Sequence, residues 1–216
     1  MLTSPNNRAN IEHIKGYGIM TSDIGKTEEI MEKIIKDNNI EPGDKQYPVN
    51  KHSIIYPDIS AYKYVRLQLE RKGVSLEAIA HDAYVQQKKF NPRLVENDFV
   101  IAADIILHKR EVLNNCMVGL SLDNLATKGM LREPLQTIIA QDQPAFGVDE
   151  TIALDICSLY GSIAVTQFGH LDLSKDGLAK TLDSNENGEV NTFIDDIVSA
   201  LISCTEAKVM HQNAGE

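Results

Sequence analysis

The stretch GVDETIALDICSLYGSIAVTQF (residues 147–168) is long, very apolar and opens on two acidic residues. Its apolar side chains are not confined to one stripe, as they would be in a helix that lies on a protein surface. Residues 149–168 therefore predict a central, buried helix. A second apolar segment, NTFIDDIVSALISC (residues 191–204), also opens on an acidic doublet, and its pattern predicts a last helix that continues to residue 210.

Helical periodicity extends outward from these two segments and dominates the chain from residue 58 onward. Apolar residues recur at three- and four-residue spacing before Gly73 and again after Ser75, so Gly73 ends one predicted helix and Ser75 caps the next. Further helices are predicted over residues 94–108, 112–127 and 131–140. With no convincing strand alternation, the sequence predicts an all-α fold, a multi-helix bundle in which a central apolar helix is surrounded by the others.

The first 57 residues differ in character from the remainder. TEEIMEKIIKDNNI (residues 27–40) can form one amphipathic helix, whereas EPGDKQYPVNKHSIIYP (residues 41–57) is rich in residues typical of loops. We predict two parts: a partly helical N-terminal extension over residues 1–57 and a single all-α domain over residues 58–216.

Composition narrows the classes of function. The chain has 216 residues, 43% of them apolar, and a formal net charge of -10, which argues against disorder and against binding to nucleic acid. Cys116, Cys157 and Cys204 lie in apolar contexts without paired spacing, which indicates free thiols in a reducing compartment. No secretory signal and no apolar run long enough to span a membrane is visible. We expect a cytoplasmic protein, with peripheral contact to the inner face of the membrane as an alternative.

The two acidic doublets, Asp149-Glu150 and Asp195-Asp196, are the candidate site. Each begins an apolar helix, and four carboxylates brought together would repel one another unless a divalent cation lay between them. Oxygen ligands of this kind suit Mg²⁺, with Mn²⁺ or Ca²⁺ also compatible. The alternative is that the acids only stabilise helix N-termini, and Thr192 with Asp195 fits a capping box.

The connection between the two apolar segments supplies a candidate phosphate ligand. Lys175 lies between Asp172 and Asp183, and its ammonium group could contact a phosphate. The alternative is a solvated loop lysine.

The order and spacing of these residues resemble the phosphatidylglycerophosphatase A family, and most closely its soluble branch, for which low-temperature-requirement protein C is one name in use. In the family pattern, an aspartate lies seven positions before an Asp-Glu pair. Further on, a Leu-Asp is followed by a lysine three residues after its aspartate, and by a second aspartate eight residues after the lysine. The last helix begins with Ile-Asp-Asp. The matching residues are Asp142, Asp149-Glu150, Leu171-Asp172, Lys175, Asp183 and residues 194–200.

The resemblance implies magnesium-dependent removal of the terminal phosphate from phosphatidylglycerophosphate, giving phosphatidylglycerol. It implies a catalytic, metal-binding set of carboxylates, comprising Asp149, Glu150, Asp195 and Asp196, with Asp142 added as a metal ligand. Lys175 and Asp172 are implied to serve the substrate phosphate. We expect transient membrane contact through an apolar surface, and a homo-oligomer.

Two alternatives stay open. Membrane-bound members of the family carry a Pro-Gly-Thr-x-Gly-Ser motif and membrane helices that this chain lacks, which favours a phosphatase for a water-soluble phosphate ester. The other alternative is a non-catalytic binding or regulatory protein that keeps the fold.

Overall fold

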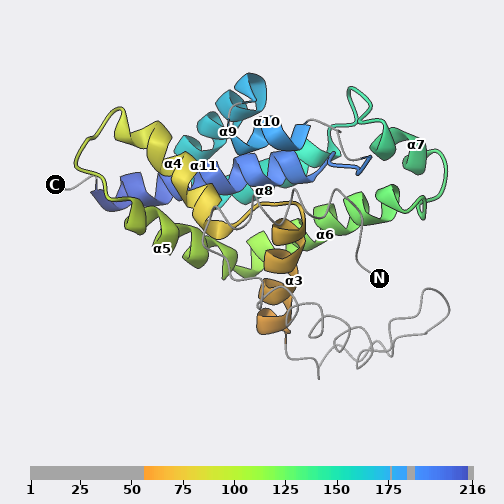
Figure 1. Cartoon of the computed structure of the whole chain (residues 1–216), viewed down its shortest axis with the longest axis horizontal. Coiled ribbons are helices and arrows are strands. Elements are labelled where there is room, and N and C mark those ends of the chain that lie inside the picture. The colour runs from red at the N-terminus through yellow and green to blue at the C-terminus, as the bar shows by residue number, and fades with distance from the viewer. Residues whose placement is uncertain (1–55, 176, 184–187, 214–216) are drawn as a thin grey trace, which may run out of the picture. The chain divides into compact units, whose positions relative to one another are not determined.

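The computed structural model describes residues 56–175, 177–183 and 188–213, and within these ranges all regular secondary structure is α-helical (Figure 1). The prediction of an all-α multi-helix bundle is confirmed. The predicted N-terminal extension lies outside the described residues except for Tyr56 and Pro57, and the boundary at residue 57 stays a prediction. In chain order the helices are α3 (Asp58–Arg71), α4 (Leu76–Lys88), α5 (Glu96–Leu107), α6 (Arg110–Thr127), α7 (Leu135–Ala140), α8 (Val148–Ser158), α9 (Ser162–Ser174), α10 (Leu178–Asp183) and α11 (Ile194–Asn213).

The turn between α3 and α4 forms as the sequence predicts. Gly73 adopts a left-handed conformation with φ of 79°, which glycine enters without the steric cost of a Cβ atom. Ser75 then caps α4, because its hydroxyl oxygen accepts a hydrogen bond of 3.0 Å from the backbone N–H of Ala78. Both local signals therefore specify the boundary between these two helices.

The central helix is α11. It packs against α4, α5, α6, α8, α9 and α10, and it runs through the middle of these helices in Figure 1. Almost every side chain from Ile194 to Ala207 is buried. The bundle does have an apolar helix surrounded by the others, but it is the last helix and not the one that begins near Asp149.

The segment predicted as one central helix over residues 149–168 forms two helices, α8 and α9. The chain breaks at Gly161, whose backbone has φ of 85° and ψ of -171°, a conformation essentially restricted to glycine. Both helices pack on α11 and on each other. The strongly apolar composition of this segment therefore reflects two helices that cover α11.

Polar residues on α11 are accommodated inside the bundle by hydrogen bonds within the helix. The hydroxyls of Ser199, Ser203 and Thr205 donate to backbone carbonyls one turn earlier, at 2.9, 2.8 and 2.7 Å respectively. Each buried hydroxyl thus has a partner and avoids the cost of an unpaired polar group. None of the described helices combines the length and apolar character needed to cross a membrane.

Candidate metal and phosphate site

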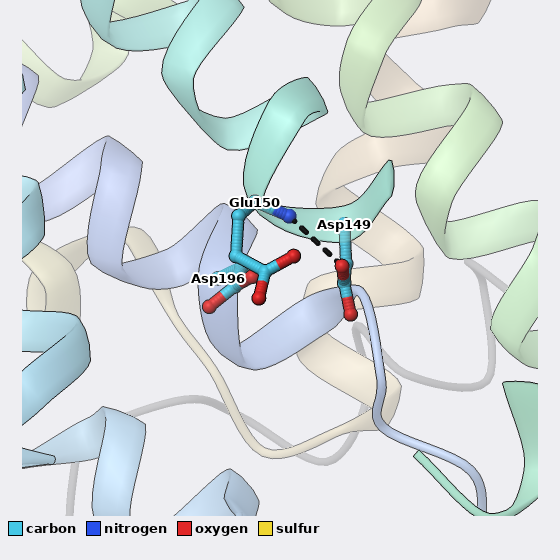
Figure 2. A group of neighbouring side chains, drawn as sticks. All are labelled: Asp149, Glu150 and Asp196. Carbon is cyan, nitrogen blue, oxygen red and sulfur yellow. Dashed lines mark hydrogen bonds between the residues drawn. The ribbon is translucent and has the colours of Figure 1, made fainter. Parts of the chain in front are cut away.

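The N-termini of α8 and α11 bring three carboxylates together. Asp149 and Glu150 lie in the first turn of α8, Asp196 lies in the first turn of α11, and these two helices pack against each other. One carboxylate oxygen from each residue lies within 4.8 Å of the others (Figure 2). We call Asp149, Glu150 and Asp196 the acid trio.

Two members of the acid trio are shielded from water, and the third, Glu150, is half-buried. Asp149 and Asp196 are 6% and 4% exposed, and the Oε2 atom of Glu150 is buried without a hydrogen-bond partner. A buried carboxylate oxygen without a partner is costly unless a proton or a cation compensates it. The acid trio therefore has an unmet requirement for positive charge.

The pKa values of Asp149 and Asp196 reflect this burial. Burial raises the pKa of Asp149 to about 7, and a hydrogen bond to Glu150 adds to this shift, while the same bond lowers the pKa of Glu150. Burial, together with the negative charge of Asp195, raises the pKa of Asp196 to about 9. Asp149 and Asp196 therefore hold protons more tightly than exposed acids do, because burial disfavours the charged form of each carboxyl group.

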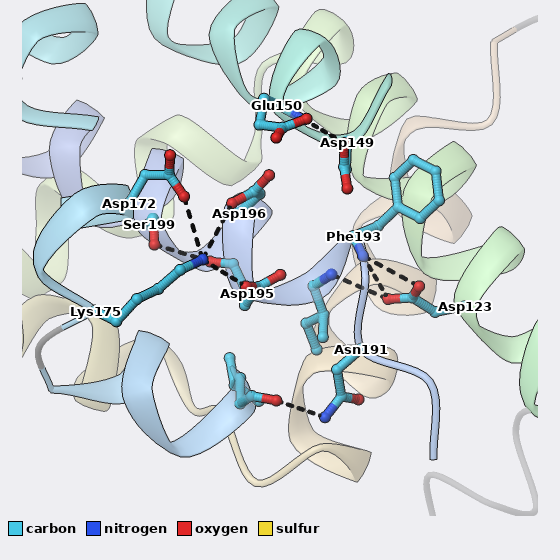
Figure 3. A network of polar contacts seen from close by, with 12 residues as sticks. Asp123, Asp149, Glu150, Asp172, Lys175, Asn191, Phe193, Asp195, Asp196 and Ser199 are labelled. Carbon is cyan, nitrogen blue, oxygen red and sulfur yellow. Dashed lines mark hydrogen bonds and ion pairs between the residues drawn. The ribbon is translucent and has the colours of Figure 1, made fainter. Parts of the chain in front are cut away.

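Lys175 provides a cation beside the acid trio. Its Nζ atom lies 2.9 Å from Asp195 Oδ2, 3.2 Å from Asp172 Oδ1 and 3.9 Å from Asp196 Oδ1 (Figure 3). Burial alone would lower the pKa of Lys175, but Asp195 and the other carboxylates outweigh burial and hold it above its ordinary value. Lys175 is therefore charged and is not a solvated loop lysine. Asp196 is a member of the acid trio and is also one of the three carboxylates near Lys175, so it joins the lysine to the acid trio.

Lys175 has an uncommon backbone conformation for a residue with a side chain. Lys175 is the residue at which α9 ends, and it adopts the left-handed conformation with φ of 47° and ψ of 51°. This conformation costs about 1 kcal/mol for a residue with a Cβ atom, and glycine is usual at such helix ends. The residue in this position is a lysine, and its side chain contacts three carboxylates.

Asp195 and Asp142 lie outside the acid trio. The carboxylate of Asp195 pairs with Lys175, and burial raises its pKa to about 6 while Lys175 opposes that shift. Asp142 is an exposed residue with φ of 46° before α8, and its negative charge contributes to the raised pKa of Asp195. The structure thus brings Asp142 near Asp195 but not into the acid trio. The side chain of Asp183 lies outside the described residues.

The structure contradicts the capping-box alternative for Thr192. The Thr192 hydroxyl donates to the carbonyl of Ile139 at 2.6 Å. The N-terminus of α11 is capped instead by Asp123 of α6, whose carboxylate accepts from the backbone N–H groups of Phe193 and Ile194. The backbone N–H groups of Phe193 and Ile194 therefore do not depend on Asp195 or Asp196 for a cap.

Sequence reasoning missed Asp82 as well as Asp123. Asp82 lies on α4, and its Oδ2 atom accepts a 2.8 Å hydrogen bond from the backbone N–H of Leu178. A Cβ atom on Gly177, which has φ of 62°, would collide with the same carboxylate. Asp82 thus fixes the chain just after Lys175. A lone acid on a helix gives no sequence signal for such a long-range contact.

The ligands available to a metal are all carboxylate oxygens, which fits a hard divalent cation. Asp149, Glu150 and Asp196 could each supply one oxygen, and the buried, unpartnered Oε2 of Glu150 is an atom that such an ion would satisfy. The site therefore combines carboxylates suited to a hard cation with an adjacent lysine suited to an anion.

Comparison with known proteins places this all-α, acid-bearing domain in a family. The family model described as phosphatidylglycerophosphatase A matches residues 84–211. The chain belongs to the phosphatidylglycerophosphatase A family, which confirms the resemblance seen in the sequence.

The chain is also similar to individual proteins, two of which carry the description uncharacterized. YpjQ of Bacillus subtilis is 38% identical over 167 residues, covering 77% of this chain and 89% of YpjQ. YutG of the same organism is 37% identical over 147 residues, covering 68% of this chain and 89% of YutG. Among solved structures, the low temperature requirement C protein of Listeria monocytogenes is similar with a TM-score of 0.69 and 35% identity, covering 72% of this chain and 98% of that one.

Proposed function

We propose that this protein is a magnesium-dependent phosphatase that hydrolyses the terminal phosphate monoester of phosphatidylglycerophosphate to give phosphatidylglycerol. One observation carries the proposal: an acid trio with two buried members and an unpartnered carboxylate oxygen lies directly beside a charged lysine. Such a pair of subsites can hold a cation and a phosphate dianion next to each other. Membership of the phosphatidylglycerophosphatase A family supports the same chemistry.

Asp149, Glu150 and Asp196 would hold the Mg²⁺ ion, each through a carboxylate oxygen. When bound, the ion polarises the phosphoryl oxygens and lowers the pKa of water. The chain itself supplies the geometry, because the acids lie on two helices whose packing fixes their separation. Burial of the acid trio strengthens every electrostatic interaction made there.

Lys175 would contact an oxygen of the substrate phosphate. Its Nζ atom donates to Asp195 at 2.9 Å, so Asp195 orients the ammonium group, and Asp172 contacts it from the preceding turn of α9. In this arrangement the lysine neutralises charge that develops on the phosphoryl oxygens. Asp195 acts through Lys175, whereas Asp196 serves both subsites.

The lipid substrate requires contact with a membrane surface, and Leu173 is a candidate for that contact. Its side chain is 87% exposed, the highest exposure among the large apolar residues described, and it lies two residues before Lys175. The net charge of -10 disfavours attraction to anionic lipid, so an inserted apolar side chain is the better source of affinity.

The test is phosphate release from phosphatidylglycerophosphate in mixed micelles, with Mg²⁺ and with chelator, for the wild type, Glu150→Gln and Glu206→Gln. Glu206 is a buried acid on α11 outside the site, so Glu206→Gln controls for loss of any buried carboxylate. We expect Mg²⁺-dependent turnover in the wild type and in Glu206→Gln, and its loss in Glu150→Gln.

Glycerol phosphate without detergent is the second substrate in the same assay. Turnover of glycerol phosphate but not of the lipid would reassign the site to soluble phosphate esters. Turnover that resists chelator, or that survives in Glu150→Gln, would contradict the proposed role of the acid trio.

A further inference from the structure

The first residues of α11 are held by a side chain from α6. Asp123 Oδ1 lies 3.1 Å from the backbone nitrogen of Phe193, and its Oδ2 atom lies 3.2 and 3.0 Å from the backbone nitrogens of Phe193 and Ile194 (Figure 3). Both oxygens of the carboxylate therefore accept from the start of α11. The two N–H groups immediately precede Asp195 and Asp196 in the chain.

The contact between Asp123 and α11 is enclosed. Asp123 is 1% exposed, and the hydrogen bonds join residues about 70 positions apart in sequence. Burial raises the pKa of Asp123 to about 8, and the N–H groups of Phe193 and Ile194 act in the opposite direction. The cost of burying this carboxyl is thus offset in part by the backbone groups that it positions.

Gly119 lies one turn before Asp123 on the same face of α6, and it allows α6 to approach α11 closely. A Cβ atom at Gly119 would lie 2.7 Å from Ile197 Cδ1 and 3.1 Å from Phe193 Cβ. The same residue, Phe193, is thus fixed at its backbone by Asp123 and at its side chain by Gly119. Two neighbouring positions of α6 specify where α11 begins.

We propose that Asp123 is a positioning residue for the acid trio: it holds the backbone of Phe193 and Ile194 so that Asp196 meets Asp149 and Glu150. The link is short, because Asp196 lies two residues after Ile194 on the same rigid helix. Asp123 contacts neither substrate nor metal and acts through α11. The inference rests on the proposed function only in taking the acid trio as the cation site.

An isosteric substitution separates positioning from packing. Asp123→Asn keeps the volume of the side chain but leaves one acceptor oxygen and places an NH₂ group against a backbone N–H group. We expect the start of α11 to shift and the affinity for Mg²⁺, measured by calorimetry, to fall about tenfold. Glu206→Gln is the matched control, since it removes another buried carboxylate from the α11 environment and should leave the Mg²⁺ affinity unchanged.

Amide hydrogen exchange in the metal-free protein gives a second, independent measurement. In Asp123→Asn the amides of Phe193 and Ile194 should exchange faster, while the amide of Val209 near the other end of α11 should stay protected. If Asp123→Asn does not fold, Gly119→Ala displaces the start of α11 from α6 without changing charge, and it should also weaken Mg²⁺ binding.

The outcomes distinguish this inference from the proposed function. A folded Asp123→Asn variant with wild-type Mg²⁺ affinity and wild-type protection at Phe193 and Ile194 would overturn the positioning role. A wild type that binds no Mg²⁺ would instead contradict the proposed function, and amide exchange alone would then decide whether Asp123 holds the start of α11. Weaker Mg²⁺ binding together with faster exchange at Phe193 and Ile194 supports the inference.

Discussion

The two ends of α11 each bury an acid, but they surround it differently. Burial raises the pKa of Asp196 to about 9 at the N-terminal end, and burial raises that of Glu206 to about 8 toward the C-terminal end. Asp196 meets two acids from α8 and lies near Lys175 of α9. Glu206 is fully buried and accepts a hydrogen bond from the amide of Gln87, while its Oε1 atom has no partner.

The comparison shows that a raised pKa does not by itself identify a site. Burial is the largest cause at both ends of α11. The N-terminal end differs because acids from a second helix and a cation from a third converge there, which is the arrangement that a metal and a phosphate require. Convergence of charge, and not burial, therefore distinguishes the candidate site from the core.

The largest expected difference is between Asp196→Asn and Glu206→Gln. Asp196→Asn removes a proposed metal ligand, and we expect Mg²⁺-dependent phosphate release to fall by about 100-fold or more. Glu206→Gln should stay within about twofold of the wild type, because it leaves the acid trio intact. Steady-state assays of phosphate release by both variants at saturating Mg²⁺ check this prediction. Comparable losses of activity in the two variants would show that the N-terminal end of α11 has no special role in catalysis.

Next in size is the effect of Lys175→Met. Loss of a charge-assisted contact worth about 1.5–3 kcal/mol should lower kcat/KM about 10- to 100-fold. Mg²⁺ affinity should not fall, since the lysine competes with a cation for Asp196. Lys180→Met is the control, because Lys180 is exposed on the neighbouring helix α10. A loss of activity in both lysine variants would show that activity depends on the total positive charge in this region and not on a specific contact of Lys175.

At the other end of α11, Glu206→Gln should change the pH dependence of stability. The folded state holds the Glu206 proton with a pKa of about 8, against 4.5 for an ordinary glutamate, so wild-type stability falls as pH rises between these values. Glutamine does not titrate, so the stability of the variant does not fall in this way. We expect the variant to be about 1–3 kcal/mol more stable than the wild type at pH 9.

Urea unfolding at pH 5, 7 and 9 checks this prediction. The exposed acid Glu111 offers a control, and Glu111→Gln should follow the wild-type curve. A constant difference between Glu206→Gln and the wild type across the three pH values would mean that Glu206 does not titrate in this range.

The smallest expected effect concerns Leu173. Replacing this exposed leucine with serine should lower binding to vesicles that contain phosphatidylglycerol about fivefold, which corresponds to about 1 kcal/mol of apolar burial. Ile59→Ser is the control, because Ile59 is 73% exposed on α3. Equal losses in the two variants would show that membrane binding does not depend on the neighbourhood of Lys175.

Local signals in the sequence were sufficient for most of the helices and for most of the site. The Gly73 turn and the Ser75 cap depend on neighbouring residues, and both formed as predicted. The acidic doublets and Lys175 were found from order and spacing, and the structure brings most of them together.

The errors concern features that depend on tertiary contacts. Residues 149–168 appeared central because they are more apolar than α11, yet the serines of α11 bond to their own helix and are accepted in the core. The break at Gly161 was missed because a glycine within an apolar run gives only a weak stop signal. Asp123 was missed because its partners lie about 70 residues away.

The burial of α11 on all sides has a consequence for protein engineering. The helix that carries Asp196 is also the centre of the hydrophobic core, so substitutions intended to alter metal chemistry would at the same time disturb folding. Leu173 and Lys175 lie at the C-terminal end of α9, where Leu173 is exposed and Lys175 is only partly buried. Libraries that aim to redirect substrate choice should therefore randomise this end of α9 and leave α11 unchanged.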